Sequence, residues 1–488
     1  MTRVVLGVDV GTSSSKGVLV DQAGRVIRTA QREHSPSRPA LGQVEMDGEL
    51  WWREFLELAG ELTAVGDVEV VAVGVSGMGP CVLLTDSAGR PLRPAILYGV
   101  DIRASQQIAR LEQELGSDAI LERGGSRLTS QAVGPKLSWV AEHEPDIWRR
   151  ARRIFMPASW LAYRLTGAYA LDHQSASQST PLYDTNALDW YRPWADLIAP
   201  NLELPPLSWP GDQVGMVAAS VAGIPAGTPV ITGTIDAWSE AVSVDAQKPG
   251  DLMLMYGTSM FMIATTDRQL RDPSLWSTVG ALPGTRNLAG GISTSGAVTS
   301  WLRDIVGGAS YSDLIAEADA SGPGGRGLLM LPYFSGERTD PDARGVLAGL
   351  RIDHTRGDIY RAALEATAFG VRRDIHTMRA AGAKIDRIVA VGGGTRGGLW
   401  TRIVSDVTGL PQEIPSITIG ASYGAAWLAA RLNGAAAIAD WNPPAKIIEP
   451  ETRLRAHYDV AAELFGELYE STSSAIHQLA TQADNYKE

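Results

Sequence analysis

The chain has 488 residues, of which 44% are hydrophobic and 20% charged, as in a globular protein with a sizeable core. The net charge of −12, without any block of consecutive basic residues, argues against binding to nucleic acid. No apolar run reaches the roughly 18 residues of a membrane span, and the N-terminus does not resemble a secretory leader, so we expect a cytoplasmic protein outside the membrane. The single cysteine, Cys81, excludes an internal disulfide, and we interpret it as a small buried residue.

Strand-like and helical segments alternate along the chain, which predicts layered α/β domains. The strand-like segments are 4–10, 16–21, 70–77, 228–234, 251–263 and 387–394, and the helical ones include 49–64, 101–115, 357–381 and 398–409. Turn residues at 245–250 predict a domain boundary, and a last amphipathic helix is expected over about 454–480. We therefore expect domains at 1–245 and 246–440, followed by a helical tail at 441–488.

The first strand-like segment leads into a turn of small residues, in the sequence GVDVGTSSSKGVLV at 7–20. Gly11 allows a ligand to approach the main chain closely, and Thr12 and Ser13 offer hydroxyl and amide donors. Such a turn suits phosphate oxygens, although a β-hairpin whose small residues only satisfy the turn explains the pattern equally well.

Charged residues flank this turn on both sides. Asp9 ends an apolar strand, where a carboxylate is costly unless a cation lies opposite, and a magnesium ion fits that requirement. Lys16 places a positive charge near the same phosphate oxygens.

The same pattern recurs after the expected boundary, in DLMLMYGTSMFMIAT at 251–265. Its turn contains Gly257, Thr258 and Ser259, so each half of the chain carries a strand, a Gly-Thr-Ser turn and a second strand. This repetition favours phosphate binding over a simple hairpin and indicates an old duplication of domains.

A third glycine cluster supports a rival function. Gly392, Gly394 and Gly397 satisfy G-x-G-x-x-G between a strand and a helix, and Glu413 lies at a tolerable distance for a ribose-binding acid, so an NAD-dependent oxidoreductase is an alternative. That alternative leaves both Gly-Thr-Ser turns unexplained. Two phosphate hairpins with one glycine-rich nucleoside turn favour ATP.

Taken together, the motifs resemble the FGGY-type carbohydrate kinases and are most similar to the xylulokinase-like members. They are, in order, GVDVGTSSSKG at the start, PAILYGVDIRA at 94–104, GPKLSWV at 134–140, TGTIDAWSEA at 232–241, YGTSM at 256–260, SGAVTSWLRD at 295–304, LPYFSGERTDP at 331–341, GVLAGLRIDHTRGDIYRAALE at 345–365 and VGGGTRGGLWTRIVSDVTG at 391–409. The resemblance covers nearly the whole chain.

The resemblance implies two actin-like (ribonuclease H-like) ATPase domains of the α/β class that flank a cleft, with sugar held mainly by the first and ATP mainly by the second. Asp9 would organise Mg²⁺. The positions that would contact the nucleotide are Gly11, Thr12, Ser13, Lys16, Gly257, Thr258, Ser259, Gly296, Ser300, Gly393, Gly394 and Gly398.

By the same resemblance, Asp236 corresponds to the catalytic base that takes the proton from the attacking sugar hydroxyl. Phosphoryl transfer needs little more from a protein than positioning, charge neutralisation and such a base, and the apolar strand before Asp236 would deliver it to the ligand-binding edge of a sheet. The alternative is that Asp236 only caps the following helix.

The sugar-binding side departs from the family pattern. The usual Met-His pair is replaced here by Met78 and Gly79, and the Asp-Asn pair ends in Ala237. Two polar contacts are therefore missing, which argues for a different ketose or polyol, or for contacts supplied elsewhere. Asp101 and Arg103 are the candidates for those contacts, although a helix start with a solvated arginine explains them almost as well.

Other interpretations concern the cleft, activity and assembly. Glu337 and Arg338 would line the cleft or form a surface ion pair. A catalytically silent actin-like ATPase is a further alternative, because the fold alone does not establish sugar phosphorylation. The resemblance also implies a homodimer.

Overall fold

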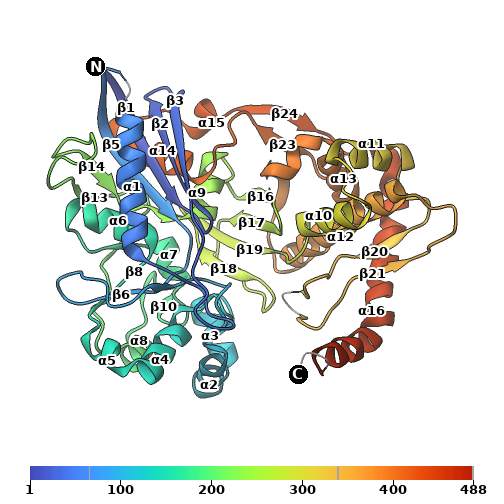
Figure 1. Ribbon diagram of the computed structural model, residues 1–488, viewed down its shortest axis with the longest axis horizontal. Helices are drawn as coiled ribbons and strands as arrows, with labels where there is room; N and C mark the ends of the chain where they lie inside the picture. Colours follow the sequence, from blue (N-terminus) through green and yellow to red (C-terminus); the bar gives the residue numbers. More distant parts are fainter. Residues whose placement is uncertain (65, 338–339, 486–488) are drawn as a thin grey trace. The chain divides into compact units, whose positions relative to one another are not determined.

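The computed structural model describes residues 1–64, 66–337 and 340–485. The chain divides into two compact units, each with its own β-sheet and covering helices (Figure 1). Unit 1 comprises Met1–Lys248, Thr265–Leu288 and Ile419–Pro443, and unit 2 comprises Pro249–Ala264, Ala289–Thr418 and Pro444–Glu488. The units are thus discontinuous, whereas the sequence led us to expect continuous domains. In the described residues, no helix has the length and apolar character needed to cross a membrane.

The sheet of unit 1 runs in the order β13-β14-β5-β1-β2-β3, and β15 also pairs with β5. Its strands are β1 (Thr2–Val10), β2 (Ser14–Asp21), β3 (Val26–Glu33), β5 (Val68–Gly77), β13 (Gln213–Met216), β14 (Pro229–Ile231) and β15 (Thr234–Ile235). β1 is antiparallel to β2 and parallel to β5. Residues 4–10 of β1 are all buried, because helices cover both faces of the sheet.

Helix α14 (Ala421–Ala430) lies against β1 and β5, although it comes from the far end of the chain. A Cβ atom on Gly7 would lie 2.0 Å from the carbonyl oxygen of Ser422, and one on Gly74 would lie 2.0 Å from that of Ala425. The two glycines face each other in the β1–β5 register. Their missing side chains let the helix backbone approach the sheet, which brings 419–443 into unit 1.

The opposite face of this sheet is covered by α1 (Gly48–Thr63) and α6 (Pro157–Thr166). Gly17 meets Leu58 and Leu62 of α1, and it lies opposite Val8, one residue along β1 from Gly7. Successive residues of a strand point to opposite faces, so α1 and α14 enclose the sheet between them.

The second sheet repeats this strand order and has one further strand, β18, at its edge. It runs β18-β19-β17-β16-β22-β23-β24. Its strands are β18 (Trp276–Val279), β19 (Arg286–Ile292), β17 (Met260–Thr266), β16 (Gly250–Tyr256), β22 (Ile385–Val391), β23 (Gln412–Pro415) and β24 (Pro444–Ile448). The hairpin β16–β17 is antiparallel and β16 is parallel to β22, as β1 is to β2 and β5. The predicted repetition of the strand-turn-strand pattern is therefore confirmed.

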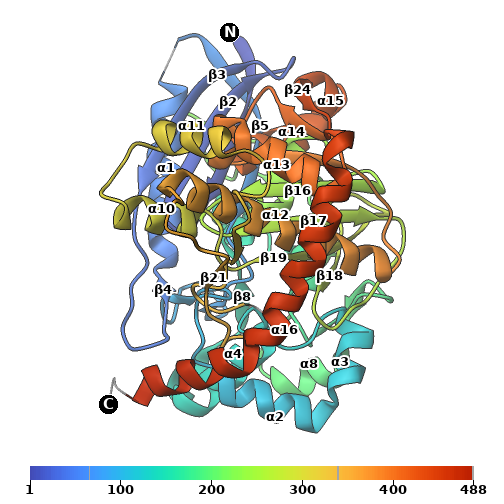
Figure 2. The same ribbon diagram turned by 90° about the vertical axis from the view of Figure 1, so that its right-hand side faces the viewer.

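Helices α12 (Arg356–Ala380), α13 (Leu399–Thr408) and α16 (Arg455–Asn485) contact one another in unit 2. α12 begins with a capping box in which Thr355 and Asp358 each bind the other's backbone N–H. α16 is the long helix that ends the chain in Figure 2 and corresponds to the helix expected over 454–480.

The packing of α14 on β1 predicts the effect of a single methyl group. We expect Gly7→Ala to lower the free energy of unfolding by about 3 kcal/mol, because the new Cβ would overlap the Ser422 carbonyl. Gly60→Ala is the matched control, since Gly60 lies inside α1 with no atom within 4 Å of the added Cβ, and it should stabilise by about 1 kcal/mol. Urea denaturation measures both, and a Gly7→Ala protein as stable as wild type would contradict this packing.

Candidate active site

Three parallel strands of unit 1 end at one edge of its sheet. β1 and β15 lie on either side of β5, and both Asp9 and Thr234 are paired with Ser76 in the register. Asp236 directly follows β15 as the first residue of α9 (Asp236–Ser243). The carboxyl ends of these strands therefore bring Asp9 and Asp236 to the same edge, where α/β proteins bind ligands.

Burial opposes the ionisation of the carboxylates at this edge, and neighbouring negative charges add to the effect at Asp9. Burial, the negative charge of Asp236 and that of Glu240 raise the pKa of Asp9 to about 8, although Ser76 Oγ donates to Asp9 Oδ1 at 2.9 Å. Burial raises the pKa of Asp236 to about 6, and Asp236 Oδ1 accepts the backbone N–H of Ala237 at 2.7 Å. Asp236 is the first residue of α9, whose N-cap is Ile235, so the alternative that Asp236 only caps this helix is wrong. It lies instead among the other acids.

Glu240, one turn further along α9, completes this group of acids. Burial raises the pKa of Glu240 to about 7, whereas Lys16 lowers it. The ammonium of Lys16 also lowers the pKa of Asp9. In the part of the chain that the structure describes, Lys16 is the cation that lowers the pKa of these acids, so their ionised forms leave an excess of negative charge that suits a divalent cation.

Among residues 1–64, 66–337 and 340–485, no three side chains of His, Cys, Asp or Glu are grouped so that they could hold a metal ion by themselves. Mg²⁺ commonly takes one or two carboxylates and completes its shell with water and phosphate oxygens. Asp9, with Asp236 at the same edge, fits that pattern of a partly protein-bound ion.

The turn 11–13 links β1 to β2 at this edge. Gly11 N–H donates to Ser14 O at 3.0 Å, which closes the turn. The Thr12 hydroxyl lies 2.8 Å from the Tyr98 hydroxyl, and Ser13 is exposed. The hydroxyl residues predicted to bind phosphate are therefore accessible at least in part.

Two of the residues predicted to contact sugar, Met78 and Gly79, directly follow β5. The Met78 side chain is buried in the hydrophobic core, and its N–H donates to Val10 O at 2.8 Å. Gly79 is half-buried beside Ile235. The Met78 side chain therefore lies in the core, and residues 78–79 continue the chain from the end of β5 at this edge.

Asp101 and Arg103 form a buried ion-pair network. Asp101 accepts the N–H of Val44 at 2.6 Å and pairs with Arg103 Nη2 at 2.7 Å, and Arg103 Nη1 pairs with Glu45 at 2.7 Å. The Arg103 side chain is 1% exposed, so the alternative of a solvated arginine is wrong. Asp101 is also not the cap of the next helix, α2 (Ser105–Leu115), whose N-cap is Ala104.

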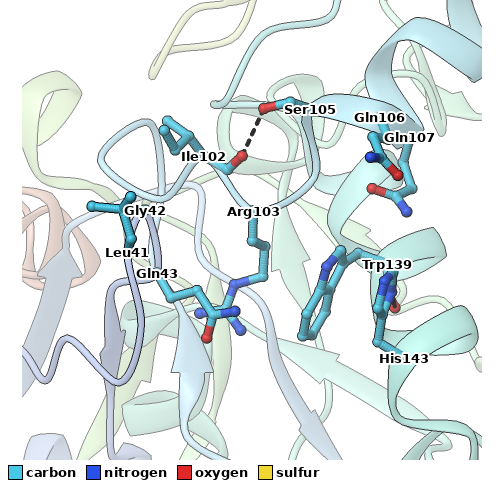
Figure 3. A pocket seen from close by; sticks show the side chains of 10 residues that line it. All are labelled: Leu41, Gly42, Gln43, Ile102, Arg103, Ser105, Gln106, Gln107, Trp139 and His143. Atoms are coloured by element: carbon cyan, nitrogen blue, oxygen red, sulfur yellow. Dashed lines mark hydrogen bonds between the residues drawn. The ribbon is translucent and has the colours of Figure 1, made fainter. Parts of the chain in front are cut away.

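Arg103 lines a pocket of about 400 Å³ in unit 1 (Figure 3). Gln43, Gln107 and Trp139 are among the other lining residues, and the Arg103 guanidinium carbon lies 4.8 Å from the centroid of the Trp139 ring. His143 is stacked against Trp139 at 4.7 Å between ring centroids. The Trp139 indole therefore contacts both Arg103 and His143, and all three side chains line the pocket.

Two residues on this side of unit 1, Tyr98 and Lys136, were not predicted from the sequence to belong to the site. Tyr98 reaches Thr12, and Lys136 in α4 (Val133–His143) donates from Nζ to the carbonyls of Leu97 and Tyr98 at 2.6 and 2.9 Å. Burial lowers the pKa of Lys136 to about 8. The sequence feature that could have indicated Lys136 is a lysine among the apolar residues of GPKLSWV. Cys81 is buried, as predicted.

In unit 2, as in unit 1, neighbouring parallel strands bring the turns that follow them to one edge of the sheet. β16 and β22 are parallel, so the turn 257–259 lies beside the glycines after β22. A Cβ on Gly392 would lie 2.5 Å from Tyr256 O, and one on Gly296 would lie 2.5 Å from Gly257 O. Gly296 N–H also donates to Gly257 O at 3.1 Å. The predicted nucleotide residues around Gly257, Gly296 and Gly394 are therefore close together, and each of these three glycines is half-buried.

Other predicted positions of unit 2 lie in the same segments of the chain. The 3₁₀ helix Gly393–Gly397 leads through Gly398, whose φ is +72°, into α13, and an added Cβ on Gly393 or Gly398 would meet no atom within 4 Å. Ser300 in α10 (Gly296–Ile305) is hydrogen-bonded to the Tyr311 hydroxyl at 2.8 Å. Open main chain of this kind suits a nucleotide.

Two acids of unit 2 have other partners. Glu413 in β23 is paired with Arg387, which opposes the ribose-binding role of the oxidoreductase alternative. Glu337 is buried, with one carboxylate oxygen 3.7 Å from Arg373. Arg338 lies outside the described residues.

Comparison with known proteins matches both parts of the chain to one family. Residues 4–243 match the N-terminal domain of the FGGY family of carbohydrate kinases, and residues 252–432 match its C-terminal domain. The xylulose kinase of Escherichia coli K12 is 29% identical over 489 residues, covering 95% of this chain and 98% of that protein. The glycerol kinase of Nocardia farcinica is 31% identical, with coverage of 88% and 90%.

A solved structure agrees with these matches. The crystal structure of xylulose kinase from Rhodospirillum rubrum superposes with a TM-score of 0.92 at 31% identity, covering 97% of this chain and 100% of that one. The predicted α/β fold with two actin-like ATPase domains is confirmed. The comparisons do not support the oxidoreductase or the silent ATPase. The chain belongs to the FGGY family of carbohydrate kinases, which transfer a phosphoryl group from ATP to an alcohol group of a sugar.

Proposed function

We propose that this kinase phosphorylates a ketose of the xylulose type and that Asp236 is its general base. The observation that carries the proposal is the convergence of β1, β5 and β15, which puts Asp236 beside Asp9 at one sheet edge. The relatives named xylulose kinases, which match nearly the whole chain, support the ketose. A related polyol is the second candidate, because the chain is similarly close to a glycerol kinase and its Met78–Gly79 position offers no polar side chain.

In this mechanism the Asp236 carboxylate accepts the proton of the sugar hydroxyl as that oxygen attacks the terminal phosphorus. Burial, which raises the pKa of Asp236, makes the carboxylate a stronger base than a solvated aspartate. Asp9 would hold Mg²⁺, which neutralises phosphate charge when bound. Lys16 adds a second positive charge at the same edge.

The phosphates of ATP would be bound by the two Gly-Thr-Ser turns, 11–13 and 257–259, and the nucleoside by the glycines at 296, 393, 394 and 398 with Ser300. The open space at Gly393 and Gly398, where an added Cβ would meet no atom within 4 Å, supports this assignment. We further propose that the enzyme is cytoplasmic, where ATP is supplied, and that it forms a homodimer, as its family resemblance suggests.

The base assignment is tested by ADP release in the presence of ketoses and polyols. We expect sugar-dependent ADP release by wild type, and a loss of at least 10³-fold in kcat for Asp236→Asn because no carboxylate accepts the hydroxyl proton. Asp86→Asn is the control, since Asp86 pairs with Arg90 in a surface turn and should keep full activity. Near-normal turnover by Asp236→Asn would refute the assignment, and a preference for polyols would replace the ketose.

The raised pKa of Asp236 predicts the pH dependence of the rate. Because only the ionised carboxylate accepts a proton, kcat/KM for the sugar should fall about tenfold per pH unit below pH 6 and be level above pH 7. The midpoint will describe the interacting Asp9–Asp236 pair rather than one residue. Initial rates from pH 4.5 to 8.5 measure it, and a rate that is constant from pH 5 to 7 would contradict the proposal.

A further inference from the structure

The turn 11–13 is supported from behind by His34, the residue that follows β3. The backbone N–H of His34 donates to Ser13 O at 3.0 Å, and its ring Nε2 lies 3.0 Å from Gly11 O. One residue thus binds the carbonyls at both ends of the turn. The His34 side chain is 5% exposed, so these contacts are shielded from solvent.

Glu54 of α1 holds the other side of the imidazole. Its Oε2 lies 2.9 Å from His34 Nδ1 and accepts the hydroxyl of Ser15 at 2.6 Å. The Glu54 side chain is 6% exposed and Ser15 is fully buried. The support therefore connects α1, β2 and β3 within unit 1.

The hydrogen bonds fix the orientation of the imidazole. Nε2 faces the carbonyl oxygen of Gly11, which can only accept, so this nitrogen carries a hydrogen and donates it. Nδ1 forms the second hydrogen bond, with the carboxyl group of Glu54. Because both ring nitrogens have partners, the ring cannot turn without losing one of these contacts.

Fixing the Gly11 carbonyl also orients the next amide. The peptide bond is planar and trans, so a Gly11 oxygen that points toward His34 directs the Thr12 N–H to the opposite side of the peptide plane. That N–H belongs to the turn proposed to bind phosphate. A polar donor held in advance binds an anion more tightly than one that must first be ordered.

We infer that His34 and Glu54 are positioning residues that hold the turn 11–13 in the conformation that binds the phosphates of ATP. The inference rests on the proposed function of that turn. Neither residue is placed here in contact with substrate, so the pair acts through the carbonyl of Gly11.

The same two elements provide a matched control. Arg32 of β3, two residues before His34, pairs with Glu57 and Glu61 of α1 at 3.1 and 2.7 Å. These two ion pairs also join β3 to α1, but they are partly exposed and do not reach the turn. Loss of a β3–α1 contact can thus be separated from loss of support for the turn.

The test is calorimetric binding of Mg-ATP, with the KM of the accepted sugar as a second constant. His34→Phe retains the ring but has no N–H, and we expect Mg-ATP affinity to fall at least tenfold while sugar KM changes less than twofold. Glu54→Gln keeps an oxygen acceptor but loses the charge, and should weaken Mg-ATP binding threefold to tenfold. Arg32→Ala should leave both constants within twofold of wild type.

Affinity for Mg-ATP within twofold of wild type in His34→Phe would overturn the inference, as would equal changes in ATP affinity and sugar KM, which indicate general destabilisation. If His34→Phe does not fold, unchanged affinity in Glu54→Gln overturns it instead. Calorimetric binding of Mg-ATP does not depend on turnover, so it tests His34 separately from the proposed base. Retained activity of Asp236→Asn would refute the assignment of the base and would leave the inference about His34 unchanged.

Discussion

The burial of carboxylates at the end of three parallel strands is the constraint on which this structure depends. Asp9 and Asp236 are brought together by strand register, and each sits where ionisation is opposed by burial. Such an arrangement opposes the ionisation of both acids, and a bound cation would offset that cost. It therefore supports the proposal that Asp9 binds Mg²⁺ and that Asp236 is a strong base.

The surroundings of this edge are built from residues that let backbones approach closely. Gly7 and Gly74 admit α14 onto the first sheet, and Gly296 and Gly392 bring two loops of the second unit against the end of β16. In both units the absence of a Cβ lets backbones approach closely: it admits a helix onto the sheet in unit 1 and brings together the loops proposed to bind the nucleotide in unit 2. The repeated strand order supports a common origin for the two halves.

Much of the fold and part of the candidate site could be predicted from local pattern. Apolar strands, small-residue turns and acids at strand ends are local features, so the hairpins, Asp9 and the position of Asp236 after its strand followed from spacing alone. Arg103 could not be placed in this way, because its burial depends on Glu45 and Asp101, which come from another segment and a loop. The G-x-G-x-x-G pattern was compatible with both NAD and ATP for a similar reason. The pairing of Glu413 with Arg387, which opposes a ribose-binding role, joins two strands and is not visible in the local sequence.

The sequence by itself determined the order of the elements, the two Gly-Thr-Ser turns and the family to which the chain is similar, because each is written in residues that are near one another. Only the tertiary structure decided that 419–443 joins the first unit, that Glu240 stands with Asp9 and Asp236, and that His34 lies behind Gly11. Those juxtapositions arise from strand register and from close contact at glycines, which bring together residues that are tens or hundreds of positions apart.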